Sequence, residues 1–159
     1  MAKLALLLAA AGLTLAASAF GAKPSGARGD ALPLKEFMGH VMQRNAEQLW
    51  TWSAEVMDAG GVHDGKPANA AGWENAESDA LTIVELTHVL ETPAYRLPSP
   101  AWSGFVRRAR AAAAASARAA EAQDYAALQK AGDDLNAACV ACHWRFAPEL
   151  EKAPPLPEL

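Results

Sequence analysis

The chain has few cysteines and no excess of positive charge. Only two of its 159 residues are cysteine, which excludes a disulfide-rich scaffold and a four-cysteine zinc site. The 14 basic residues are outnumbered by 18 acidic ones, and the net charge of −4 argues against a nucleic-acid partner. No segment shows the two-residue alternation of a strand over a useful length. The sequence therefore predicts an all-α protein.

The first residues are typical of an export signal. Lys3 precedes an apolar run that ends in small residues, and the triplet Ala-Ser-Ala ending at Ala19 matches a signal-peptidase site. We predict a signal peptide over residues 1–19, with cleavage after Ala22 as the alternative, and a flexible segment over 20–32. The apolar run is short for a membrane span, and a retained anchor is the other interpretation. Export in a bacterium would place the protein in the periplasm.

The remaining chain is predicted to form one helical domain over residues 33–150, followed by a proline-rich tail over 151–159. Apolar residues recur every three or four positions in four stretches, which glycine- and proline-rich segments separate. The predicted helices are 33–57, 73–91, one from Ala101 through the alanine-rich run, and one that begins at an N-cap on Asp124. Helices of this length bury their apolar faces by packing together, so we predict an antiparallel four-helix bundle.

Many of the positions predicted to face the core hold small residues. Alanine favours the helix but fills little volume. Such helices either pack very closely or leave room for something large. The predicted inward positions of the second and fourth helices are Trp73, Ala76, Ala80, Ile83, Thr87, Leu90, Leu128, Ala131, Leu135, Ala138 and Cys142.

Both cysteines belong to the sequence CVACH near the end of the last predicted helix. Cys139 and Cys142 lie three residues apart, and His143 follows at once. A zinc site would need a fourth ligand, and a thioredoxin-type dithiol would follow a strand; a plain buried or disulfide-bonded pair is the simplest alternative. C-x-x-C-H is the attachment signature of c-type haem, in which each thiol adds to a vinyl group and the histidine ligates iron. We predict one haem c on these three residues.

The position of this motif resembles one family of cytochromes. Ordinary small cytochromes c carry the attachment site near the N-terminus, whereas here it ends the fourth predicted helix. CVACHWRF, the four-helix pattern and LKEFMGHV in the first helix resemble the class II cytochromes c, the cytochrome c′ family, over about residues 33–150. The resemblance implies an antiparallel bundle with haem between the helices and His143 as the fifth ligand. Family members are often homodimers through their first two helices, so a homodimer is an open expectation.

The family divides according to what lies on the other side of the iron. In cytochrome c′ proper an apolar side chain covers that face, and the five-coordinate iron binds small gases such as NO and CO; in low-spin members a methionine ligates the iron. Met38 lies at the matching place and is our predicted second axial ligand. Met42 and His40 are alternatives, and plain core packing also suits methionine. His40 is turned by about 200° from Met38 on a helix and is predicted to face away.

These residues predict an electron carrier rather than an enzyme. Ligation by histidine and methionine raises the haem potential, and no nucleophile beside a base or pair of carboxylates in an apolar setting is evident. We predict a one-electron carrier that meets periplasmic or membrane-bound redox partners. A five-coordinate gas-binding haem protein is the alternative, and a haem-free helical binding module is a third. Residues that would bind the haem propionates stay open among Trp102, Arg107 and Arg108, because Leu34 replaces the arginine that the family carries there.

Overall fold

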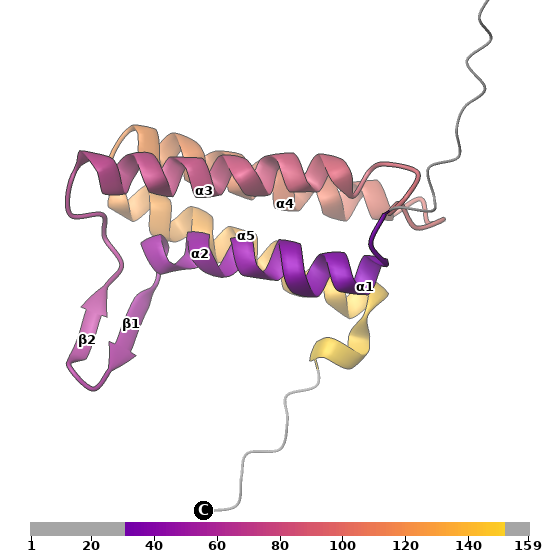
Figure 1. The fold of residues 1–159 in the computed structure, drawn as a ribbon, viewed down its shortest axis with the longest axis horizontal. Helices are drawn as coiled ribbons and strands as arrows, with labels where there is room; N and C mark the ends of the chain where they lie inside the picture. The colour runs from indigo at the N-terminus through magenta and orange to yellow at the C-terminus, as the bar shows by residue number, and fades with distance from the viewer. Residues whose placement is uncertain (1–30, 152–159) are drawn as a thin grey trace, which may run out of the picture.

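The computed structural model describes residues 31–151 (Figure 1). The predicted signal peptide, most of the segment over 20–32, and residues 152–159 of the predicted tail lie outside the described residues. Within this range, four long helical segments pack along a common direction, together with a short β-hairpin at one end. The all-α prediction is confirmed for the bulk of the described chain.

The first helical segment contains a π-helix that its sequence pattern did not indicate. α1 (Leu34–Glu36), η1 (Phe37–Met42) and α2 (Gln43–Ser53) follow one another directly, and in η1 the N–H of Gln43 donates to the carbonyl of Met38. Hydrogen bonds between residues five apart place Phe37 and Met42 on the same face, and both are buried. In an α-helix these two residues would be turned by about 140° from each other. The π-helix therefore adds Phe37 to the core.

A β-hairpin occupies the place where we predicted the end of the first helix and a loop. α2 ends at Ser53, and β1 (Glu55–Asp58) pairs antiparallel with β2 (Gly61–Asp64). The expectations of a helix up to residue 57 and of no strand were both wrong. Each strand has only four residues, too few to show a clear alternation. Gly61, which opens β2 directly after the turn, has φ of 112°, a conformation that glycine adopts readily.

The other three helices agree closely with the sequence pattern. α3 (Ala70–Val89) begins at Asn69, whose side chain accepts a hydrogen bond of 3.0 Å from the N–H of Gly72. α4 spans Trp102–Glu121, and α5 spans Tyr125–Phe146. Asp124 caps α5 as predicted, because its side chain accepts a 3.0 Å hydrogen bond from Ala127. All the predicted inward residues of α3 and α5 are buried except Cys142, which is half-buried.

Packing of the four segments forms two hydrophobic clusters. α4 lies against both α3 and α5, and α2 also contacts α3 and α5. We call the end near the hairpin the hairpin end; its cluster surrounds Trp73, Ala76 and Leu128. We call the other end the motif end; its larger cluster includes Leu49 and Ile83, with Cys139 packed against it. The large core therefore lies beside the cysteine motif.

None of the helices that the structure describes combines the length and the apolar composition needed to cross a membrane. The short 3-10 helix η2 (Pro148–Glu151) follows α5 and ends the described chain. Helix α5 therefore stops two residues before Pro148, close to where the sequence predicted the end of the fold.

Candidate functional site

The last helix brings the three residues of the cysteine motif into one cavity. Cys139, Cys142 and His143 are spaced by three and four residues, so they lie on the same side of α5. All three are half-buried, and all three line a cavity between the helices. The local reason is the α-helical periodicity of α5, whose inward residues Leu135 and Ala138 continue the same wall.

Every long helical segment contributes to this cavity. Its walls are almost wholly apolar, and none of the described Asp, Glu, Lys or Arg residues lines it. The interior is narrow, about 50 Å³, which corresponds to roughly one or two water molecules. Besides the motif, the lining residues are Met38, Met42, Ala46, Ile83, Thr87, Leu90, Phe105, Val106, Ala109, Leu135 and Ala138.

Two methionines face the motif from the first helical segment. Met38 and Met42 both line the cavity, and Met42 is the more deeply buried of the two. His40 does not line it: its side chain is 77% exposed, and its Nε2 lies 3.2 Å from a carboxylate oxygen of Glu36. The structure therefore brings both predicted methionines to the site and leaves the histidine alternative on the surface.

Aromatic side chains hold the helices around the cavity. Phe37 of the π-helix packs on Tyr95, with ring centroids 4.6 Å apart. Trp102 donates a 2.9 Å hydrogen bond to the carbonyl of Leu90, and its ring meets the edge of Phe146 at 5.1 Å. Sequence reasoning missed Tyr95 and Phe146. Tyr95 lies in a proline-rich connection with no periodicity, so no local signal marks it as a core residue.

Burial and hydrogen bonding set the state of the polar groups at the cavity. Burial raises the pKa of the Cys142 thiol, so the thiol keeps its proton at neutral pH. Thr87 Oγ1 donates to the carbonyl of Val84 at 2.6 Å and accepts from Nε of Arg110 at 2.9 Å. Arg110 also donates to the carbonyl of Thr87 at 3.1 Å. This arginine is therefore engaged in joining α4 to the last turn of α3.

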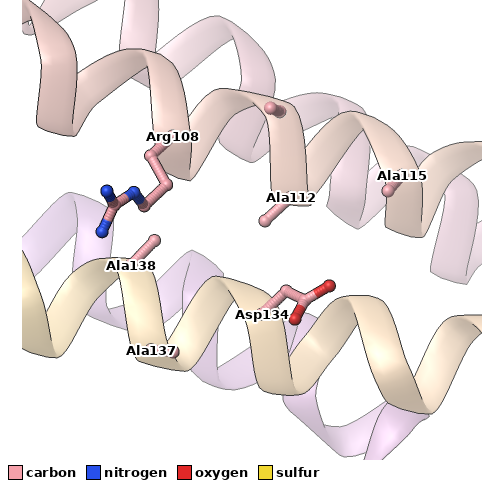
Figure 2. A pocket seen from close by; sticks show the side chains of 7 residues that line it. Arg108, Ala112, Ala115, Asp134, Ala137 and Ala138 are labelled. Atoms are coloured by element: carbon pink, nitrogen blue, oxygen red, sulfur yellow. The ribbon is translucent and has the colours of Figure 1, made fainter.

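Two further arginines of α4, close to Arg110 in the sequence, lie on the surface. Arg107 and Arg108 are both exposed. Figure 2 shows Arg108 extending from α4 into an open groove floored by alanines, with Asp134 of α5 on the opposite side. Ala138 borders both this groove and the cavity. Of the candidates for binding propionates, Trp102 uses its indole N–H within the core, whereas Arg107 and Arg108 stay available to solvent.

The side chains that line the cavity are of the kinds that haem c would need, but the cavity is too small to contain a haem. The two thiols would attach haem c, and the imidazole together with one of the two methionine thioethers would ligate its iron. An interior of about 50 Å³ holds no porphyrin, so the helices would have to move apart to admit one. Within residues 31–151, no three His, Cys, Asp or Glu side chains are grouped so that they could hold a metal ion by themselves.

Comparison of the chain with protein-family models, with curated proteins and with solved structures gives no match.

Proposed function

We propose that this protein is an exported, periplasmic c-type cytochrome that carries single electrons. One haem c would be attached through Cys139 and Cys142, with His143 on one side of the iron and Met38 as the second axial ligand. The fold would then be an antiparallel four-helix bundle that encloses the haem, as in the low-spin members of the cytochrome c′ family. Bound haem supplies an iron that alternates between the ferrous and ferric states.

One observation carries the proposal. The three residues of the attachment motif line the same cavity as Met38 and Met42, although more than 90 residues of sequence separate the two groups. The attachment motif needs thiols and an imidazole on one helical face, and the second ligand must come from a facing helix. Both requirements are consistent with the lining of this cavity.

The remaining wall residues would tune and protect the site. Apolar side chains such as Ile83 and Val106 exclude water, and a low dielectric around an iron centre is one of the factors that set its potential. The alanines among the lining residues offer little resistance to separation of the helices. The protein would therefore hold the haem, orient its ligands and restrict access to it.

The mass of the mature chain and its absorption spectrum test the proposal. The full chain is expressed in a host with haem-attachment machinery, beside a Cys139→Ser/Cys142→Ser double variant as control. The expected result is a covalent haem on the wild-type chain alone and a low-spin reduced spectrum with a sharp alpha band. A wild-type mass equal to the bare polypeptide would contradict haem attachment.

The predicted sixth ligand has its own test. Met38→Ala should convert a low-spin haem to a high-spin one, because it removes a ligand from the iron. Met57→Ala is the matched control, since Met57 is 79% exposed on the hairpin. An unchanged spectrum for Met38→Ala would exclude Met38, and the same substitution at Met42 then identifies or excludes the alternative ligand.

A gas-binding haem protein is the second candidate. The observation in its favour is that Ile83, Phe105 and Val106 line the cavity, so apolar side chains are at hand to cover one face of an iron without ligating it. Met38 would then serve only in packing. A high-spin spectrum of the wild type that changes strongly with carbon monoxide would favour this candidate, whereas a low-spin spectrum insensitive to carbon monoxide would contradict it.

A further inference from the structure

The cavity gathers an unusual set of soft donor atoms. Four sulfur atoms, from Met38, Met42, Cys139 and Cys142, belong to side chains that line it, together with the imidazole of His143. The chain has only six sulfur-containing residues, so four of the six lie at this one place. Thioethers and thiolates are the ligands that favour Cu(I), whereas harder ions prefer oxygen.

The size and the charge of the cavity point to the same class of ligand. Its interior of about 50 Å³ suits a single ion and is far too small for an organic cofactor. No Asp or Glu lines it, so it lacks the carboxylates that calcium or magnesium would require. A monovalent ion bound by one thiolate forms a neutral unit, which an apolar wall accommodates at low cost.

We propose that the haem-free protein binds one Cu(I) ion in this cavity, with ligands from the motif on α5 and from the methionines of η1. One thiol of the motif coordinates the ion as a thiolate and releases its proton to solvent, the other ligands stay neutral, and no electron is transferred. The proposal is independent of whether haem is ever attached. Because both groups use the same cysteines, bound Cu(I) and covalent haem exclude each other.

Methionine substitutions separate this site from a simple pair of thiols. The full chain is produced without haem-attachment machinery, reduced, and titrated anaerobically with Cu(I) against a chromogenic chelator. We expect one ion per chain. Met38→Leu/Met42→Leu conserves volume and should weaken Cu(I) binding by at least about 10-fold, because it removes two thioether ligands and the loss of a mere outer-shell partner already costs about 10- to 100-fold at metal sites. Met57→Leu, on the exposed hairpin, should leave the affinity unchanged.

Three results would overturn the proposal. The first is wild-type Cu(I) affinity in the double methionine variant, which would assign binding to the cysteines alone. The second is an equal loss of affinity in Met57→Leu. The third is that the folded haem-free chain binds no Cu(I). If circular dichroism shows that the haem-free chain is unfolded, the corresponding result is that added Cu(I) produces no gain in helix. Zn(II) binding should not respond to the methionine substitutions, because thioethers are poor ligands for zinc.

Discussion

The two ends of the packed helices differ in how they fill the space between them. Where α2 ends beside the hairpin, the backbones approach closely: Trp50 donates a 3.2 Å hydrogen bond to the carbonyl of Gly132, and a Cβ added to Gly132 would collide with Ser53 Oγ. At the motif end larger side chains surround a cavity, and the first segment departs from α-helical geometry. Close packing therefore stabilises one end, and the other keeps space beside reactive side chains.

The two ends should therefore respond differently to changes in side-chain volume. Interiors packed to crystal-like density resist any change of volume, whereas a region that already contains a cavity repacks more easily. We expect the hairpin end to contribute most to stability and the motif end to tolerate changes of shape. Four sets of substitutions test this expectation.

The largest effect should come from truncating a core residue at the hairpin end. Leu128→Ala should lower the free energy of unfolding by about 2–5 kcal/mol, because Leu128 is fully buried and its closely packed surroundings have little freedom to collapse. Leu135→Ala, beside the cavity, should cost less within the same range, since that wall is free to shift. Denaturant unfolding of both variants measures the difference. Equal costs would contradict the distinction between the two ends.

Added volume should also have opposite outcomes at the two ends. Ala120→Leu, which is buried at the hairpin end, should destabilise the protein by about 1–3 kcal/mol through overpacking. Ala46→Leu would place its side chain in the cavity and should cost much less in the haem-free protein. The same Ala46→Leu change should reduce the yield of covalent haem, measured by mass spectrometry. Normal haem attachment in Ala46→Leu would argue against haem in this cavity.

Two glycines within helices, one at the close approach of α2 and α5 and one away from it, give a matched pair of substitutions. Gly132→Ala should destabilise by about 1–3 kcal/mol, because its new Cβ would collide with both Ser53 Oγ and Ser53 Cβ. Gly104→Ala meets nothing within 4 Å and should stabilise α4 by about 0.5–1 kcal/mol. Thermal unfolding of the two variants shows whether each substitution raises or lowers the stability. A stabilising Gly132→Ala would show that α2 and α5 lie farther apart.

The smallest effect should come from a hydroxyl at the hairpin end. The buried Tyr125 hydroxyl makes no hydrogen bond of good geometry with the described residues, so Tyr125→Phe should change stability by no more than about 0.5 kcal/mol. Burial, and then Asp64, raises the pKa of this tyrosine. A raised pKa means that the folded state favours the neutral hydroxyl. This contribution to stability is fully present at a pH below the ordinary pKa of tyrosine, and it is lost as the pH rises through the pKa of Tyr125 in the folded protein. Denaturant unfolding at pH 7 and above pH 10 checks both statements; a large loss at neutral pH would reveal a hydrogen bond.

The sequence predicted helices best where caps and periodicity agree. Asp124 marks the start of α5, and the regular stripe of that helix predicts its buried face. The stripe of α3 likewise predicts a buried face, although α3 begins at Ala70 and not at the predicted Trp73. The first segment was less predictable because the π-helix depends on tertiary packing, above all on Phe37 against Tyr95. The hairpin escaped prediction because its strands are too short for a periodic signal.

The candidate site was predictable only in part, for a similar reason. Its attachment motif is contiguous, so local sequence is enough to identify Cys139, Cys142 and His143. The facing side of the cavity is a product of packing, and spacing alone did not distinguish Met38 from Met42. Nor did spacing indicate that the cavity would be narrow. Those properties depend on how four separate helices meet.

The cavity joins the first helical segment of the described chain to its last long helix. Met38 and Met42 enter it from η1, and the cysteines enter it from α5, so neither half of the polypeptide holds the complete set of ligands. During synthesis the cavity is incomplete until α5 has been made and has packed against the other helices. A chain interrupted before residue 139 would lack both cysteines of the cavity, so the haem attachment that we propose would take place only after the last long helix had been made.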